Sequence, residues 1–323
     1  MQAIMVNEYG DSEVLHPETV HDPEPGPGEV LVRIAAAGVN YMDIYQRTGA
    51  HGYASTPPFI PGAEGAGQID LVGKDVAGFK QGDLVAWASV PGSYAELTSA
   101  PVGRLVRVPD GISAETAAAV MLQGMTAHYL VSDTYPVKPG DVVVVHAGAG
   151  GVGLLLIQLA KARGAVVVAT TSSDEKASLA ASVGADYCTT YEQFEDTVMS
   201  VTSGEGAAAV FDGVGKATFI QGLAVLRPRG MMALYGAASG PVASVEMTSI
   251  SGKSLFLTRP SLRDHIATTE ELRQRAEELF QQIREGQLTV HIGKRYPLAD
   301  AARAHAELAA RSTTGKLLLL PTL

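Results

Sequence analysis

A glycine-rich turn joins a predicted apolar strand to a predicted apolar helix in the middle of this chain. The strand covers Asp141 to Val145, the turn reads His146-Ala147-Gly148-Ala149-Gly150-Gly151-Val152-Gly153, and the helix covers Leu154 to Arg163. A second apolar strand follows at Val166 to Thr170. An isolated turn of this kind also fits an ordinary strand-to-helix loop, but the strand–turn–helix–strand order is typical of a dinucleotide-binding unit.

The small residues of this turn suit a pyrophosphate. Ala147 permits a tight bend after the strand, Gly150 lets bare backbone approach the phosphates, and Gly153 lets the helix pack closely on the sheet. The helix N-terminus then offers unpaired N–H groups and a partial positive charge to the anion. We therefore expect the whole turn to contact a dinucleotide, through Ala147, Gly148, Ala149, Gly150, Gly151, Val152 and Gly153.

The composition argues against several other classes of protein. With 323 residues, 46% of them hydrophobic and 18% charged, the chain has the balance of a globular protein of two domains. A net charge of −10 argues against nucleic acid or an anionic membrane as the main partner. Cys188 is the only cysteine, and neither a signal peptide nor a membrane-spanning run is visible. We expect a cytoplasmic protein without a membrane partner.

The order of predicted elements changes near Ser113. Before it, short strands alternate with glycine- and proline-rich turns, which indicates an all-β unit and favours a barrel. After it, strands and helices alternate, which indicates a parallel sheet with helices on both faces. We predict an α/β protein with one domain formed by residues 1–124 and 265–323 and a dinucleotide-binding domain formed by residues 125–264.

The apolar patterns place the remaining elements. A helix is predicted from Ser113 through Thr134. Further helices are predicted over 175–183, 216–226 and 269–285. Strands are predicted over 1–6, 29–37, 68–72, 84–88, 93–98, 208–212, 231–235, 254–258 and 315–320.

Five segments spread over nearly the whole chain carry a family resemblance. They are Ala36-Ala37-Gly38-Val39-Asn40-Tyr41-Met42-Asp43-Ile44-Tyr45, Pro61-Gly62-Ala63-Glu64-Gly65-Ala66-Gly67, Ala147 to Gly153, Thr258-Arg259-Pro260-Ser261-Leu262 and Tyr296-Pro297-Leu298. With this order of units, the chain resembles the medium-chain dehydrogenase/reductase superfamily, and within it the zinc-independent NADPH:quinone oxidoreductases of the zeta-crystallin-like branch. The resemblance implies a GroES-like β-barrel catalytic domain and a Rossmann domain with a doubly wound parallel sheet.

The residues at the metal positions of the superfamily predict that no metal is bound. Zinc dehydrogenases of this superfamily carry a cysteine at the position of Asn40 and a histidine at the position of Ala63, just before a glutamate that matches Glu64. A catalytic zinc needs about three nitrogen, sulfur or oxygen ligands that converge on one point. Asn40, Asp43 and Glu64 would be a poor oxygen-only substitute.

The end of the second strand of the dinucleotide unit favours NADPH over NADH. An NAD site usually has an acidic residue about 20 positions after the glycine turn, but this strand ends in hydroxyl-bearing residues, and Ser172 or Ser173 can cap the next helix. In the resembled family, positions that match Lys176, Tyr191 and Arg311 surround the 2′-phosphate of NADPH. Each of the three alone could be a solvated side chain.

The resemblance implies the rest of the cofactor site. Asn40 and Thr126 are expected near the nicotinamide and its ribose. The ends of the later strands of the parallel sheet are expected to surround the nicotinamide, because ligands of doubly wound folds bind at the carboxyl ends of the strands. The residues that we expect to contact the cofactor outside the glycine turn are Asn40, Thr126, Ser172, Lys176, Tyr191, Gly213, Val214, Tyr235, Gly236, Thr258, Arg259 and Arg311.

The chemistry implied is hydride transfer to an activated acceptor. Without zinc to polarise a carbonyl group, the acceptor must take up charge by itself, as a quinone or an enone does. Asn40, Tyr45 and Tyr53 are the candidate catalytic residues, with the tyrosine hydroxyl groups able to donate a hydrogen bond to the acceptor. Either tyrosine also fits a half-buried aromatic residue that only packs.

Two alternatives to a quinone reductase stay open. One is an NADPH-dependent reductase of enoyl thioesters or 2-haloacrylates. The other is an NADPH-binding protein without enzymatic activity, as in the lens crystallins of this branch.

The apolar strands expected at the edge of the parallel sheet predict that the protein is a homodimer. The strands 231–235 and 254–258 are both apolar and are expected to end the parallel sheet, where an uncovered edge invites pairing. A monomer results if the amphipathic helix 269–285 covers this edge instead.

Overall fold

The structure is a computed structural model that describes residues 1–50, 52–53 and 55–322. The chain forms two compact units, one made of Met1–Met125 with Ile266–Leu323 and the other of Thr126–His265. Each boundary lies one residue from the domain boundary that we expected from the sequence. None of the helices in the described part of the chain has the length and apolar character needed to cross a membrane.

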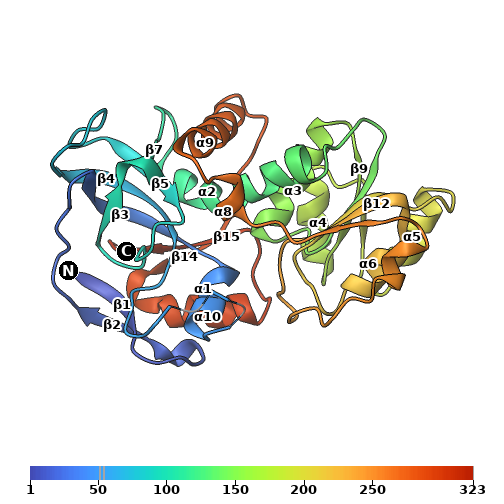
Figure 1. Ribbon diagram of the computed structural model, residues 1–323, viewed down its shortest axis with the longest axis horizontal. Helices are drawn as coiled ribbons and strands as arrows, with labels where there is room; N and C mark the ends of the chain where they lie inside the picture. Colours follow the sequence, from blue (N-terminus) through green and yellow to red (C-terminus); the bar gives the residue numbers. More distant parts are fainter. Residues whose placement is uncertain (51, 54, 323) are drawn as a thin grey trace. The chain divides into compact units, whose positions relative to one another are not determined.

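The first unit is built on a seven-stranded sheet around β3 (Glu29–Val39) (Figure 1). β3 is antiparallel to β4 (Glu64–Val72), β6 (Leu97–Pro101) and β15 (Lys316–Leu320). The sheet continues through β5 (Leu84–Ala88) and β7 (Val106–Arg107) on one side and β14 (Ile292–Pro297) on the other. The sequence therefore brings its last strand, β15, against its third.

The remaining elements of the first unit lie outside this sheet. β1 (Gln2–Val6) and β2 (Leu15–Thr19) form a separate antiparallel pair. The helices are α1 (Tyr41–Arg47), the amphipathic α9 (Thr269–Arg284) and α10 (Ala301–Ala309), together with the first part of α2 (Ala114–Tyr129). Three 3₁₀ turns cover Ser12–Val14, Val102–Arg104 and Leu298–Asp300. The core combines residues from β1, β3, β5 and β15, among them Ile4, Val32, Trp87 and Leu319.

The prediction of a strand over residues 93–98 was wrong for the first half of this range. Ser93 and Tyr94 lie in a turn whose backbone N–H groups donate to the carbonyl oxygens of Gly62 and Pro61, at 3.2 and 3.0 Å. Gly92, at a φ of +84°, makes this turn possible. The strand β6 begins only at Leu97.

The second unit contains a six-stranded parallel sheet in the order β10–β9–β8–β11–β12–β13. The six strands are β8 (Val142–Val145), β9 (Val166–Thr170), β10 (Tyr187–Thr189), β11 (Ala207–Asp212), β12 (Leu226–Leu234) and β13 (Phe256–Thr258). Numbered along the chain within this unit, the order is 3-2-1-4-5-6, the order of the Rossmann fold. The expected doubly wound parallel sheet is therefore confirmed.

Helices cover both faces of this sheet, as predicted. Figure 1 shows α3 (Gly151–Ala162) and α4 (Asp174–Ser182) on the side opposite α5 (Phe194–Val201) and α6 (Phe219–Ala224). Phe194 of α5 and Phe219 of α6 pack with Val144, Val210 and Met232 of the sheet in one buried cluster. A π-helical turn over Leu130–Thr134 follows α2, and the short helices α7 (Thr248–Ser251) and α8 (Leu262–His265) complete the unit.

The structure corrects the prediction for the last strands. The predicted helix 216–226 shrinks to α6, because a glycine turn at Gly215, with a φ of +88°, delays its start and because Leu226 already pairs with Ala207 in the sheet. The strand predicted over 231–235 thus begins at Leu226 and lies between β11 and β13. β13 alone forms that edge of the sheet.

Candidate functional site

The glycine-rich turn lies at the carboxyl end of β8, the first strand of the parallel sheet. Ala147 has a φ of 54°, a left-handed conformation that turns the chain away from the strand. The N–H of Gly148 donates to the carbonyl oxygen of Thr170 in the neighbouring β9, at 2.9 Å. The helix α3 begins at Gly151 with Gly150 as its N-cap, and no side chain caps it. The first turn of the helix therefore presents backbone N–H groups at the sheet edge where ligands bind.

The predicted start of α3 at Leu154 was one turn late, and the packing of Gly153 shows why glycine opens this helix. A Cβ at Gly153 would lie 2.8 Å from the oxygen and 2.9 Å from the carbonyl carbon of Gly148, closer than side chains approach backbone. A Cβ at Gly150 would meet only the oxygen of Ala147, at 3.2 Å. The helix can begin close to the strand because Gly153 has no side chain.

The side chains of His146 and Thr170 form hydrogen bonds at the start of the glycine-rich turn. His146 is fully buried, and its Nδ1 lies 3.0 Å from Oγ1 of Thr170, which also accepts a hydrogen bond from the N–H of Ala147 at 3.3 Å. Burial lowers the pKa of His146, so the ring is neutral near pH 7. The His146 ring also stacks on that of Tyr191, with their centroids 6.1 Å apart. Tyr191 is thereby placed beside the glycine turn.

The start of α4 brings together two of the predicted cofactor residues. Ser173 is the N-cap and accepts a hydrogen bond from the N–H of Lys176 at 3.3 Å. Nζ of Lys176 donates to Oγ of Ser172 at 3.2 Å. Of the two serines considered as caps, Ser173 caps the helix and Ser172 contacts the lysine. Arg311, the third predicted phosphate contact, belongs to the first unit, where it follows α10 at a φ of 56°.

Asp212 organises the loop after β11, a role that sequence reasoning missed. Its buried carboxylate accepts hydrogen bonds from the N–H groups of Val214 and Gly215, at 2.7 and 2.9 Å, and from the hydroxyl of Thr218 at 2.8 Å. The available signal was an aspartate at the end of an apolar strand, directly before Gly213. This carboxylate fixes the backbone of Gly213 and Val214 at the sheet edge.

Gly213 and Gly236 face each other across the ends of β11 and β12. A Cβ at Gly236 would lie 2.9 Å from Cα of Gly213, and a Cβ at Gly213 would lie 2.8 Å from the ring of Tyr235. Burial raises the pKa of Tyr235, which keeps its hydroxyl protonated. Arg259, after Thr258 at the end of β13, donates to the carbonyl oxygen of Leu234 at 3.1 Å. Thr126 is buried in α2.

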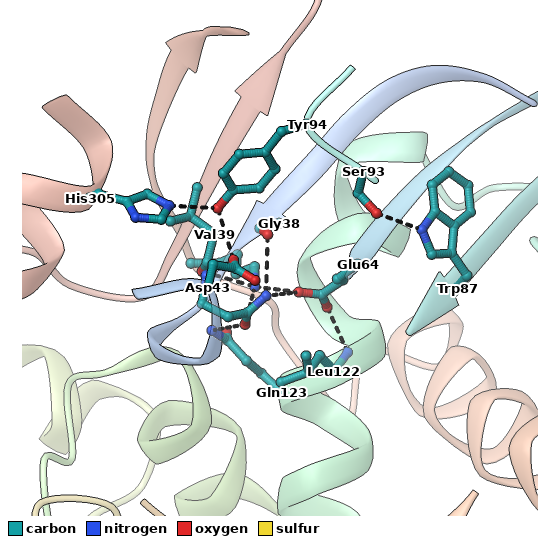
Figure 2. Close-up of polar contacts among 12 residues, drawn as sticks. Gly38, Val39, Asp43, Glu64, Trp87, Ser93, Tyr94, Leu122, Gln123 and His305 are labelled. Carbon is teal, nitrogen blue, oxygen red and sulfur yellow. Dashed lines mark hydrogen bonds and ion pairs between the residues drawn. The ribbon is translucent and has the colours of Figure 1, made fainter. Parts of the chain in front are cut away.

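A second group of polar residues is buried in the first unit, around Asn40 and Glu64 (Figure 2). Nζ of Lys316 lies 2.5 Å from Oε2 of Glu64 and 2.9 Å from Oδ1 of Asn40. Nδ2 of Asn40 donates to Oε2 of Glu64 at 3.0 Å and to the carbonyl oxygen of Gly38 at 3.2 Å. Oδ1 of Asn40 also accepts from Nε2 of Gln123 at 3.4 Å. The carboxamide of Asn40 is therefore fully engaged inside this group.

Asp43 connects this group to a chain of hydrogen bonds. Its Oδ2 accepts from the N–H of Asn40 at 2.9 Å and from the hydroxyl of Tyr94 at 2.8 Å. Nε of Arg47 donates to Nδ1 of His305 at 3.3 Å, so Nε2 of His305 carries a hydrogen and donates to the Tyr94 oxygen at 2.9 Å. Burial raises the pKa of Asp43 to about 7. Burial and the charge of Arg47 lower the pKa of His305 to about 3.

The candidate catalytic tyrosines lie next to each other on and after α1. The ring centroids of Tyr45 and Tyr53 are 5.8 Å apart, and the centroid of Tyr41 lies 6.4 Å from that of Tyr45. The side chain of Tyr53 is exposed, and that of Tyr45 is half-buried. Asn40 lies directly before the same helix. The three candidate residues therefore come from one local segment.

Known proteins are similar to this chain over both units. Residues 26–110 match the family model of the alcohol dehydrogenase GroES-like domain, and residues 151–283 match that of zinc-binding dehydrogenases. The chain is 45% identical to a quinone oxidoreductase of Pseudomonas aeruginosa, covering 97% of both chains. It is 37% identical to a 2-haloacrylate reductase of a Burkholderia species, covering 99% of both chains.

A solved structure supports the same relationship. The quinone oxidoreductase of Escherichia coli complexed with NADPH superposes with a TM-score of 0.96 at 36% identity, over 99% of this chain and all of that one. With the match to the GroES-like domain, this confirms the expected architecture of a GroES-like domain and a Rossmann domain.

The buried polar group does not have the donor set of a zinc site. Position 40 offers an amide and position 63 a methyl group, where a catalytic zinc needs ligands such as thiolate or imidazole. The carboxylate of Glu64 is already bound by the ammonium of Lys316, whose charge repels a divalent cation. Within the described residues, no three histidine, cysteine, aspartate or glutamate side chains are placed to hold a metal ion.

Proposed function

Because this chain belongs to the zinc-independent quinone oxidoreductase branch of the medium-chain dehydrogenase/reductase superfamily, we propose that it is an NADPH-dependent quinone oxidoreductase. The observation that carries the proposal is the uncapped start of α3 behind a left-handed Ala147, in a parallel sheet of Rossmann order. This arrangement suits a pyrophosphate. The quinone oxidoreductase relatives and the NADPH complex of one of them support the substrate and the cofactor.

We assign the cofactor contacts to the residues at the edge of the parallel sheet. The backbone of Ala147 to Gly153 holds the pyrophosphate. Lys176 with Ser172 holds the 2′-phosphate, because an ammonium and a hydroxyl group that can both donate to the phosphate meet there. Tyr191 is a further contact, since its ring lies beside the glycine turn. Arg311 stays a prediction from the family resemblance. The carboxyl-end loops at Gly213, Val214, Tyr235, Gly236, Thr258 and Arg259, with Thr126, surround the nicotinamide. Asn40, in the first unit, stays a prediction from the family resemblance.

Bound NADPH supplies the hydride, and the side chains of the protein position and stabilise the acceptor. Tyr45 and Tyr53 have phenol groups that can donate a hydrogen bond to the acceptor oxygen as negative charge develops there. Asn40 contributes to the reaction through the fixed orientation of its carboxamide. This group is held by hydrogen bonds with Lys316, Glu64, Gly38 and Gln123.

Steady-state oxidation of NADPH tests the proposal against its alternatives. We expect turnover with naphthoquinone, and faster turnover with NADPH than with NADH. Faster reduction of a 2-haloacrylate than of any quinone would favour the second candidate, which the similarity to the haloacrylate reductase supports. Tight NADPH binding without oxidation by any quinone, enone or haloacrylate would show a binding protein without enzymatic activity.

We also propose that the protein is a cytoplasmic homodimer. The edge strand β13 exposes Phe256 by 57% and Leu257 by 37%, and Met247, the N-cap of α7, is exposed by 74%. An apolar edge strand in water favours pairing with a second copy of the chain. A single, half-buried Cys188 suits a reducing compartment. Light scattering that gave the mass of one chain, 33.6 kDa, at micromolar concentration would contradict the dimer.

A further inference from the structure

Lys316 is a lysine buried in the interior of the first unit. Only 1% of its surface is exposed, and it is the first residue of β15, a strand that is otherwise made of leucines. Its ammonium donates to the side chains of Glu64 and Asn40, at 2.5 and 2.9 Å, and to the carbonyl oxygen of Val39 at 3.3 Å. The three acceptors match the three N–H groups of the ammonium. A lysine is rarely buried to this degree without a dedicated set of partners.

The surrounding backbone leaves room for this ammonium. A Cβ at Gly38 would lie 2.7 Å from Cε and 2.8 Å from Nζ of Lys316, and it would also collide with the carboxylate of Glu64. Gly38 has an ordinary backbone conformation within β3, because its φ is not positive. The glycine is therefore explained by space for the ion pair, and not by a turn.

The ion pair fixes the orientation of two further groups. Glu64 uses Oε2 for Lys316 and Asn40, and its Oε1 accepts from the N–H of Leu122 in α2 at 2.6 Å. Because Lys316 donates to Oδ1 of Asn40, the carboxamide must turn its NH₂ group towards Glu64 and Gly38. A nonpolar residue at position 316 would remove the shorter of the two hydrogen bonds to Oδ1 of Asn40, leaving that from Gln123, and would leave the charge of Glu64 uncompensated.

We propose that Lys316 is a positioning residue of the reaction, whose buried charge orients Asn40 at the start of α1. The inference rests on the proposed function, in which Asn40 takes part in the reaction. The ammonium of Lys316 donates to Oδ1 of Asn40, the residue at the position where the zinc enzymes of the superfamily carry a cysteine ligand. Because only 1% of its surface is exposed, Lys316 is assigned a positioning role and not a catalytic one.

The test separates this role from a contribution to folding alone. Lys316→Met removes the charge of the lysine and leaves the buried carboxylate of Glu64 without a cation. Lys316→Met combined with Glu64→Gln removes both charges, so the stability lost in the single variant should be largely regained. Lys294→Met is the matched control, since it breaks an ion pair between Lys294 and Glu307, 2.7 Å long, at the surface of the same unit.

Three quantities are measured for each variant: the urea midpoint of unfolding, the dissociation constant of NADPH, and kcat with naphthoquinone. We expect the double variant to unfold near the wild-type midpoint and to bind NADPH within about twofold of wild type, while its kcat stays at least about tenfold lower. The Lys294→Met control should keep its kcat. Persistence of the low kcat in a stable double variant supports the proposal.

Recovery of kcat together with stability in the double variant would overturn the proposal, because Lys316 would then only neutralise Glu64. A double variant that does not fold would also overturn it, because Lys316 would then serve the fold whether or not Glu64 is charged. Failure of the wild-type protein to oxidise NADPH with any quinone would refute the proposed function before the variants are compared.

Discussion

Replacing Gly153 by alanine should disrupt the cofactor site through a single methyl group. The added Cβ would lie closest to the carbonyl oxygen of Ala147, then 2.8 Å from the oxygen and 2.9 Å from the carbonyl carbon of Gly148, whereas ordinary contacts begin near 3.4 Å. The Cβ would be about half an ångström too close to Gly148 and about twice that too close to the oxygen of Ala147, and these backbone atoms cannot rotate away. The start of α3 must move away from the turn after β8, at a cost of about 1–3 kcal/mol in the free energy of unfolding.

The same movement should weaken NADPH binding, because it displaces the backbone N–H groups at the start of α3. A loss of about 1–3 kcal/mol in binding corresponds to a dissociation constant about 5- to 150-fold higher. Urea unfolding and fluorescence titration with NADPH measure the two effects on the same protein sample.

Two other glycines give a graded set of controls for this substitution. Gly150→Ala meets a single contact of 3.2 Å and should have an intermediate effect, whereas Gly252→Ala meets nothing within 4 Å and should have none. If Gly153→Ala bound NADPH as tightly as Gly252→Ala, the proposed approach of α3 to the pyrophosphate would be refuted.

Three further predictions concern specificity, catalysis and pH. Lys176→Glu should weaken NADPH binding by about 1–3 kcal/mol and leave NADH binding almost unchanged, and equal losses for both cofactors would refute the phosphate assignment. Tyr45→Phe should lower kcat about tenfold, whereas an unchanged kcat would direct attention to Tyr53. The third prediction concerns Asp43 and His305, whose titrations change the free energy of unfolding in opposite directions. The pKa of Asp43 is raised from 3.8 to about 7, so the unfolded chain releases this proton first and stability falls as the pH rises between these values. The pKa of His305 is lowered from 6.5 to about 3, so the unfolded chain binds this proton first and stability rises with pH over that window. Asp43→Asn should leave only the rise, and a urea midpoint that is no higher at pH 6.5 than at pH 4.5 would contradict this.

The dinucleotide unit could be predicted because its determinants are local in sequence. A glycine-rich run between two valine-rich strands identifies a β–α–β unit, and the alternation that follows predicts the parallel sheet. The start of α3 was predicted late, because Gly151 and Gly153 have low helix propensity and look like a loop. Their position in the helix follows from the space available beside Gly148, which a sequence does not display.

The buried polar group of the first unit could be predicted only in part. Asn40 was noticed because it occupies a metal position of the superfamily, and Glu64 because it follows another, but Lys316 was not, although it is the cation that binds both. It lies 252 residues from Glu64 in the sequence, at the start of a leucine-rich strand that predicts only a buried β-strand. Tyr94 and His305 are joined to Asp43 by the same kind of long-range pairing. Burial and pairing of this kind depend on the register between distant strands.

The proposed reaction, direct hydride transfer from NADPH to a quinone, is open to one decisive measurement. The preformed complex of the wild-type protein and NADPH is mixed with naphthoquinone in a stopped-flow instrument, once with ordinary NADPH and once with NADPH deuterated at the transferred position of the nicotinamide. We predict rapid loss of the reduced-nicotinamide absorbance in a single turnover, with a slower rate for the deuterated cofactor and no change after prolonged chelation of metal ions. No oxidation of the bound NADPH, or an oxidation that stops when metal ions are removed, would contradict the proposed function.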